Sequence, residues 1–570
     1  MDRSISRFPE RRPFMWSSPG SASRDDEDFS RFDVHALARE RIGIGGTDET
    51  LLDIFLDTAD CSARPTYELP VFRKVFGERG LEDIRDGHLK NPTEPAAWLH
   101  DRNRHNQPRP YNGTITASRF YELTKENVVV YFDALTDTRR IYLPSPTLDT
   151  LGVLILRASE HQAPVMKDLI FKYLKADNSI NLHSTVGGEV GGEFVLGFHM
   201  PFFAWRTKEP LREDPRPMSD GSRLRNHIDL TFLSESKSKK ILTEGNEYLY
   251  EGQSSVCITG RNTVVWTALC LADTHFDNPD PNNEYLLSFY DSTEDSDSTS
   301  LPMDALSVGS RTAINMSGLD PREYFLLVVK FRVQRIKDEW IKILYELKDR
   351  TNAYLYDPHI PLRRRKTSLG TAADESQDVE RSEAWVKQSS HLLTRLINCI
   401  AETIGVWEKF ASRDAERLIH GTDDDIAGRI VSTCWDIREL FDEMEKAHTG
   451  LKSLKSELEN FKTEFQLVTP MALAGSMMQA GLTYGNKVAC FALMSVAITI
   501  ITFAIQPALT WYHRKSGHQV CLPMKPKKLD MVMDSDEAVS MKRSGFSLPP
   551  FPDFVYKRHS RRSDAGMNEV

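Results

Sequence analysis

The sequence has few cysteines, no recognisable export signal and only one long apolar run. Its seven cysteines are scattered, none forms a Cys-x-x-Cys pair, and no cysteine–histidine spacing matches a zinc site. We therefore expect reduced thiols, as in a cytosolic compartment, and neither disulfides nor structural zinc. The first residues lack the apolar core of a secretory signal peptide, so we expect the N-terminal region to be cytoplasmic.

The charge balance excludes further function classes. The 570 residues carry a formal net charge of −10, and no basic stripe is interleaved with aromatic residues, so nucleic acid is not an expected partner. No Ser/His/Asp, Cys/His or paired-carboxylate arrangement has an interpretable spacing, so we expect neither enzymatic activity nor a bound cofactor. The mean hydropathy of −0.42 fits one membrane region in a mostly polar chain.

The first 350 residues divide into two parts. We interpret residues 1–110 as an N-terminal extension that is partly disordered. An α/β domain is expected over 111–350, because partly alternating apolar runs are typical of strands in a covered sheet. A helix is expected over Ala163–Leu174, between two of these runs. The runs interpreted as strands are Val128–Phe132, Leu151–Leu156, Glu193–Trp205, His227–Leu233, Tyr248–Thr259 and Thr263–Leu271.

A well-defined helix start follows near the end of this domain. Asp320 can cap the helix, Pro321 suits the first helical position, and Glu323 occupies the capping-box position. Its apolar positions then recur with helical spacing, so we expect the helix to end near Lys348.

A flexible linker is expected over 351–381. Its basic stretch RRRKTS resembles a kinase substrate site, with Thr367 and Ser368 as modification candidates. A solvated linker without modification would show the same pattern.

A helical hairpin and stalk are predicted over 382–466. A first helix over about 382–418 is followed by a turn, after which a long stalk helix returns antiparallel to it. The apolar residues of the stalk are spaced three and four apart, which is typical of a coiled-coil seam with one irregular step. Part of the seam must pack on the preceding helix, and the rest is available to identical stalks in an oligomer. The seam comprises Ile430, Cys434, Ile437, Phe441, Met444, Ala447, Leu451, Leu454, Leu458, Phe461, Phe465 and Val468.

A transmembrane region is predicted over 467–510. The segment 488–509 contains no charged residue and is long enough to span a bilayer, whereas the uncharged segment 467–485 contains proline and glycine and forms a weaker span. Lys and Arg follow the stronger span, so the tail over 511–570 should stay cytoplasmic. We therefore expect an integral membrane protein of the plasma membrane or an organelle membrane, with both the N-terminal domain and the tail cytoplasmic.

Two acidic stretches are candidates for metal binding. The stretch ADTHFD and the stretch DSTEDSD contain oxygen ligands of the kind that hard cations prefer. Solvated polar groups at a strand end and in a loop would give the same pattern. The candidate ligands are Asp273, Asp277, Asp291, Glu294 and Asp295.

The order of these parts resembles the CorA family of Mg²⁺ transporters, and in particular its divergent fungal-type branch. The resemblance covers about residues 114–515, with an α/β domain, a helical hairpin, a long stalk and terminal membrane helices. Local sequence is also similar, in FHMPFFAWR, VVWTALCLADTHFD and LDPREYFLLVV. The family's Gly-Met-Asn motif corresponds to Tyr484-Gly485-Asn486, where the Met is missing, and a simple turn has the same sequence.

The resemblance implies a function as well as a fold. It implies a homopentameric, CorA-like transporter or channel for divalent cations, with Mg²⁺ as the transported or regulatory ion. Tyr484, Gly485 and Asn486 would form the selectivity site at the pore, and the acidic candidates above would sense cytoplasmic Mg²⁺. The alternative is a non-conducting, membrane-anchored oligomeric scaffold or sensor on the same fold, which the incomplete motif favours.

Overall fold

A computed structural model describes sixteen segments of the chain. Its contacts divide the chain into two units, residues 1–476 and 477–570, and nearly all of the described residues belong to the first. The structure describes residues 50–58, 68–77, 80–102, 107–109, 111–127, 138–158, 162–185, 193–207, 210–234, 246–260, 263, 265–277, 284–291, 303–310, 320–356 and 372–479.

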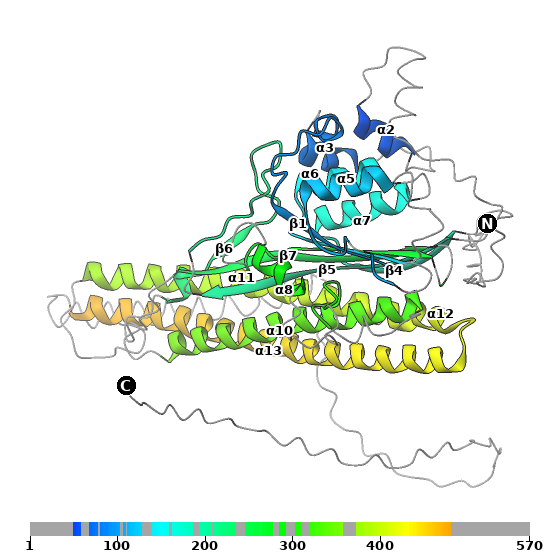
Figure 1. Ribbon diagram of the computed structural model, residues 1–570. Helices are drawn as coiled ribbons and strands as arrows, with labels where there is room; N and C mark the ends of the chain where they lie inside the picture. The colour runs from blue at the N-terminus through cyan, green and yellow to red at the C-terminus, as the bar shows by residue number, and fades with distance from the viewer. Residues whose placement is uncertain are drawn as a thin grey trace, which may run out of the picture. The chain divides into compact units, whose positions relative to one another are not determined.

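An eight-stranded mixed sheet lies at the centre of the first unit (Figure 1). Its order is β2-β1-β3-β8-β7-β5-β4, with β6 paired on β7. Among the described strands, β3 and β8 pair in parallel and the other pairs are antiparallel. The strands are β1 (Pro95–Arg102), β2 (Gly113–Thr116), β3 (Thr138–Pro144), β4 (Ser179–Thr185), β5 (Glu193–Thr207), β6 (His227–Asp229), β7 (Glu247–Gly260) and β8 (Trp266–Ala272).

Both faces of the sheet are buried. Along β8, Ala268 and Cys270 belong to one apolar core, and Leu269 and Leu271 belong to the other. Strands covered on both faces are expected to be nearly continuous apolar runs, which explains why the runs at β5, β7 and β8 alternate only in part. The expectations for Glu193–Trp205, Tyr248–Thr259 and the helix from Ala163 are therefore confirmed.

Short helices cover one face of the sheet (Figure 1). The run Leu151–Leu156 is part of one of them, so the expectation of a strand there is wrong. Thr147 caps this helix by accepting a hydrogen bond from the Thr150 amide, and the short apolar run alone could not distinguish a buried helix from a buried strand. The helices are α2 (Leu51–Thr58), α3 (Leu69–Phe76), α4 (Gly80–Arg85), α5 (Ala117–Asn127), α6 (Leu148–Arg157) and α7 (Ala163–Lys175).

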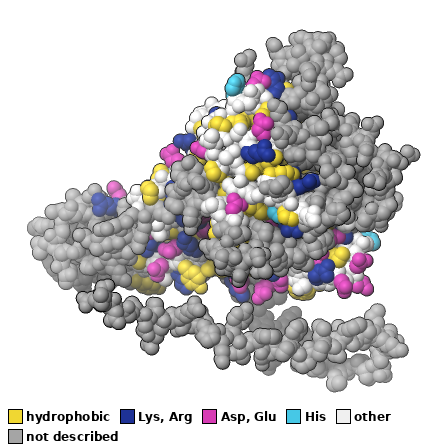
Figure 2. All heavy atoms as spheres, in the orientation of Figure 1, with side chains coloured by type: hydrophobic (Ala, Val, Ile, Leu, Met, Phe, Trp, Pro, Cys, Tyr) yellow, Lys and Arg dark blue, Asp and Glu magenta, His cyan; other side chains and the backbone are white. Residues whose placement is uncertain are grey.

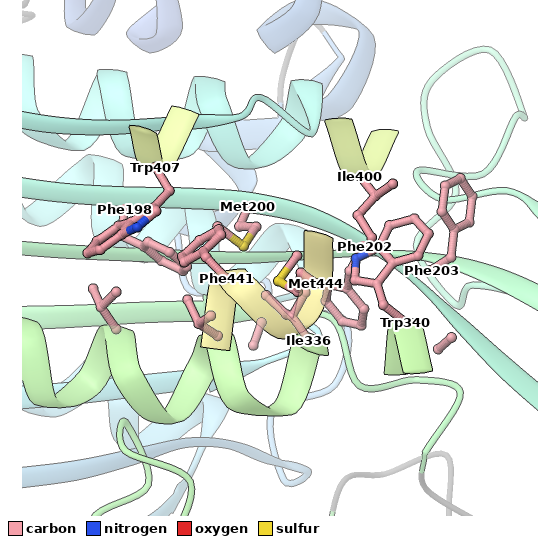
Figure 3. Packing of buried hydrophobic residues seen from close by; sticks show 14 of the residues in the cluster. Phe198, Met200, Phe202, Phe203, Ile336, Trp340, Ile400, Trp407, Phe441 and Met444 are labelled. Atoms are coloured by element: carbon pink, nitrogen blue, oxygen red, sulfur yellow. The ribbon is translucent and has the colours of Figure 1, made fainter. Parts of the chain in front are cut away.

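Long helices cover the opposite face. Side chains from β5, α10, α11 and α13 meet in one core, where the Trp340 ring lies edge-on against Phe203 and the Trp407 ring stacks on Phe441 (Figure 3). The capped start at Asp320 is confirmed, since its side chain accepts from the Arg322 amide. The elements are α8 (Glu284–Asp291), α10 (Pro321–Leu355), α11 (Ala372–Arg413), α12 (Ala415–Ile419), α13 (Asp424–Gln479) and the short 3₁₀ helix η1 (Thr231–Ser234).

Helices α10 and α13 run parallel in a heptad register. Their contacts advance by one heptad in both helices, as in a coiled coil. At the last contact a Cβ on Gly450 would lie 2.9 Å from Leu344, so the glycine permits the close approach. The three ion pairs are at least partly exposed, and such pairs contribute little stability. They therefore identify the register, which the apolar packing determines. The contacts are Glu323 with Arg429, Lys330 with Asp436, Lys337 with Glu443, and Leu344 with Gly450.

The chain before residue 111 takes part in this fold. We expected the α/β domain to begin at 111, but β1 pairs with β3 inside the sheet, and apolar residues of α2, α3 and α4 share the core of its first face. These elements are short, and β1 contains His100 and Asp101, so neither helical nor strand periodicity is strong there.

The predicted C-terminal transmembrane helices are contradicted, and with them the expected membrane region and the integral-membrane localisation. Within the part of the chain that the structure describes, no helix is both long and apolar enough to cross a membrane. The long helices are apolar on one side and charged on the other, which is the pattern of helices that bury one face. The segments 488–509 and 511–570 lie outside the described residues, and 467–485 is described only as far as Gln479, as the end of α13.

We predict that Trp340→Ala lowers the free energy of unfolding by about 3–5 kcal/mol, the usual cost of deleting a buried aromatic side chain. Trp340 is 0% exposed and joins the sheet to the helices. Equilibrium unfolding in urea measures the change. Tyr345→Ala, on the same helix but at a side chain that is 68% exposed, is the control and should change the stability by less than about 0.5 kcal/mol. Equal effects in the two variants would contradict the role given to Trp340.

Candidate functional site

Asp273, a candidate metal ligand, lies directly after β8 and is buried between two arginines. One carboxylate oxygen is 2.8 Å from Nη1 of Arg216, and the other accepts from Nε of Arg225 at 2.6 Å and from the backbone amide of Gln253 at 2.8 Å. The hydroxyl of Tyr173 also donates to Asp273. The carboxylate is thus surrounded by donors from α7, β7 and the 210–226 segment.

The two arginines are themselves paired. Arg216 forms two hydrogen bonds of 2.7 Å with the carboxylate of Asp214. Arg225 donates to the backbone carbonyls of Tyr173 and Leu174 at the end of α7, where a cation is favoured by the helix dipole. The cluster of Tyr173, Asp214, Arg216, Arg225 and Asp273, which we call the buried ion cluster, therefore joins α7 to the end of the sheet.

The charges of the cluster hold its acids in the ionised form. Burial by itself raises the pKa of Asp273, but the neighbouring Arg225 and Arg216 guanidiniums outweigh it and hold that pKa well below its usual range. The pKa of Asp214 is lowered in the same way, mainly by Arg216 against the cost of burial. Burial lowers the pKa of His275 and keeps its ring neutral. This arrangement supplies structural ion pairs rather than a free acid or base.

The other two described candidate ligands also have protein partners. Asp277 accepts from Arg206 of β5 and from Arg335 of α10, and Arg206 in turn pairs with Glu339 at 2.8 Å. Asp291, at the end of α8, accepts from the Thr114 amide at 3.0 and 3.1 Å. In the described ranges, no group of three or more His, Cys, Asp or Glu side chains could hold a metal ion.

The remaining site candidates lie outside the described residues. They are the acids Glu294 and Asp295, the modification candidates Thr367 and Ser368, and the pore candidates Tyr484, Gly485 and Asn486.

The arginine partners were missed in the sequence. Asp273 and Asp277 are far along the chain from their arginine partners, as for Asp277 with Arg206 and Arg335, and such pairs are visible only in the folded protein. One signal was available, because arginines recur in the stretch 212–225, which has no helical or strand periodicity. Such a stretch needs acidic partners when it is buried.

An exposed apolar stripe on α13 was also missed. Trp435 is 60% exposed and Val431, one turn earlier on the same side, is 39% exposed. The described core-facing residues of the helix, from Ile430 to Leu458, are buried or nearly so, as the seam predicted. Large apolar side chains that remain exposed beside one another are typical of contact surfaces.

Charged residues of both signs extend this stripe along the same side of α13. The Arg438 guanidinium lies 5.3 Å from the Trp435 ring centroid, close enough for a cation–π contact. Asp424 and Gly428 precede the apolar pair and Asp442 and Lys446 follow it, all exposed. Figure 2 shows acidic and basic side chains intermingled along the lower edge of this view, where α10 and α13 run. The residues Asp424, Gly428, Val431, Trp435, Arg438, Asp442 and Lys446 form what we call the α13 stripe.

No protein-family model matches the chain, and no curated protein matches it. The resemblance to the CorA family thus remains an expectation from the sequence.

We predict that Asp273→Asn destabilises the protein by about 3–5 kcal/mol at pH 7, because it leaves Arg216 and Arg225 without their shared charge. The folded pKa of Asp273 lies below the unfolded value of about 4. Its contribution is therefore complete above about pH 5 and is lost as the pH falls through the folded pKa. Urea unfolding between pH 7 and pH 3 should show a flatter acid dependence in the variant.

Asp83→Asn, at an exposed position of α4, is the control for this comparison. It should leave both the stability at pH 7 and its acid dependence close to those of the unchanged protein. An Asp273→Asn variant as stable as this control would show that the buried ion cluster does not hold the fold together.

Proposed function

We propose that this chain is a self-associating scaffold protein without enzymatic activity, and that two copies join through the α13 stripe. The observation that carries this proposal is the exposure of Trp435 beside Val431 on a helix whose other side is packed in the core. Tryptophan and arginine are the side chains that most often dominate the energy of protein interfaces. Covering both apolar side chains in a second copy removes them from water at a gain of roughly 25 cal/mol for each Å².

The charges of the stripe support an antiparallel arrangement of the two copies. Asp424 and Lys446 lie at equal sequence distances before and after Trp435. When two α13 helices cross antiparallel at Trp435, Asp424 of each copy faces Lys446 of the other. Gly428 then faces Asp442, and a Cβ at Gly428 would meet nothing within 4 Å, so this position leaves room for the partner. The same surface is thus complementary to itself, as a two-fold interface requires.

Transport of divalent cations stays a prediction from the family resemblance. The pore candidates Tyr484, Gly485 and Asn486 lie outside the described residues, and Asp273 and Asp277 are paired with arginines. No contact of the described residues favours Mg²⁺ transport over the scaffold function. The pentamer implied by the resemblance likewise stays a prediction, and the α13 stripe supports pairing of two copies.

We predict that Trp435→Ala weakens self-association by about 30-fold or more, the effect of losing an interface residue worth at least about 2 kcal/mol. Sedimentation equilibrium over a range of protein concentrations measures the association constant. Tyr345→Ala removes a side chain that is also exposed, on α10 and outside the stripe, and should leave association unchanged. A protein that stays monomeric at all concentrations, or a Trp435→Ala variant that associates normally, would exclude this interface.

We further predict that charge exchange identifies the antiparallel geometry. Asp424→Lys places like charges opposite one another at both ends of the interface and should weaken association several-fold. Adding Lys446→Asp restores opposite charges and should recover most of the loss. Thermal unfolding of each variant controls for the favourable effect of Asp424 at the helix N-terminus. A double variant no better than the single one would reject this arrangement even if Trp435 is required.

A further inference from the structure

A second group of buried cations lies on the face of the sheet that α10 covers. Arg140 of β3 and His100 of β1 are cross-strand neighbours in register, so their Cβ atoms are about 5 Å apart. Each is only 3% exposed. The Arg140 guanidinium lies 4.4 Å from the Tyr324 ring centroid of α10 and 5.8 Å from the ring of Trp266. His100 stacks on Trp98 with ring centroids 5.5 Å apart.

The polar atoms of this group lack acceptors. Nε and Nη1 of Arg140, both ring nitrogens of His100 and Nε1 of Trp266 are buried and have no hydrogen-bond partner in the structure. Burial and the charges of Arg140 and Arg102 lower the pKa of His100 to about 3, so its ring is neutral at pH 7 and offers one N–H donor. Buried donors without partners thus lie on three side chains from the adjacent strands β1, β3 and β8, and an unpaired buried donor is costly.

A second buried guanidinium lies on the same face of the sheet. It belongs to Arg332 of α10, which is 3% exposed and lies over the ring of Tyr142 of β3. Arg332 donates to the backbone carbonyls of Leu306 and Ala305, which are neutral acceptors, at 2.7 Å each. A buried charge is stable only when it is paired or otherwise compensated.

The nearby carboxylates are already engaged. Asp304 accepts from the hydroxyls of Tyr324 and Ser307, each at 2.9 Å, and Asp291 accepts from the Thr114 amide. Asp304 attracts Arg102, but burial and the repulsion from Arg140 together lower the pKa of Arg102. Of the acids in the described ranges, none forms a hydrogen bond or a salt bridge with Arg140.

We propose that Arg140, His100 and Trp266 form a binding site for a small tetrahedral oxyanion of the phosphate or sulfate class. The forked donors of an arginine match the oxygens of such an anion, and donors from three side chains suit a tetrahedral ligand better than a planar carboxylate. The charge of such an anion also compensates the buried Arg140 guanidinium, with which none of the described acids pairs.

The test is binding of inorganic phosphate to the intact protein. Isothermal titration should show binding at constant ionic strength, and the melting temperature should rise with phosphate concentration but not with chloride or acetate, because the ligand binds only the folded state. Arg140→Gln should weaken the binding about tenfold or more, since a hydrogen bond to a charged partner is lost. His100→Phe keeps a ring to stack on Trp98 but removes the donor, and it should also weaken phosphate binding. This second variant tests the site even if Arg140→Gln does not fold.

Arg157→Gln is the matched control. Arg157 also lies over a tyrosine, 5.3 Å from the Tyr121 ring centroid, and also has a buried Nε without a partner, but it is on α6, which covers the other face of the sheet. This variant should bind phosphate as the unchanged protein does. Absence of phosphate binding in the unchanged protein overturns the proposal. Unchanged affinity in His100→Phe, or in a folded Arg140→Gln, also overturns it.

Discussion

Both faces of the central sheet are apolar, and the need to cover both of them determines the rest of the fold. Short helices from the first half of the chain cover one face, and the bundle of α10, α11 and α13 covers the other. Because α10 lies against β5 and β7 on one side and α13 on the other, it is buried almost all round in its first half. The position of α13, and hence which of its residues remain exposed, follows from this packing.

Burial also explains how charged residues are distributed inside the protein. The buried ion cluster around Asp273 is balanced, with two acids and two arginines bound to one another and to backbone groups. Arg140 is as deeply buried, but none of the described acids pairs with its guanidinium. The free-energy cost of burying a charge therefore supports two different inferences. Where the charges are paired we infer a structural role, and where a charge has no partner we infer a bound ligand.

Much of the fold could be predicted from the sequence, and the failures have identifiable causes. The helix start at Asp320, the long strands β5 and β7 and the seam of α13 each have a strong local signal. The prediction of a strand at Leu151–Leu156 was wrong because six consecutive apolar residues have no period. The C-terminal transmembrane helices were predicted from apolar length, a basic flank and the resemblance, but no helix of the described residues is long and apolar enough to cross a membrane. The buried ion cluster and the α13 stripe could not be predicted from the sequence. The pairing of Asp273 with Arg225 and the exposure of Trp435 both depend on contacts between distant segments.

The parallel register of α10 and α13 has a mechanical consequence. A force along the axis of α13 would load the contacts at Glu323, Lys330, Lys337 and Leu344 at the same time, in shear, rather than peel them apart one after another. Helix α13 continues to Gln479, well beyond the last of these contacts. A pull on its far end would therefore move α10, and the sheet on which α10 rests, together with α13.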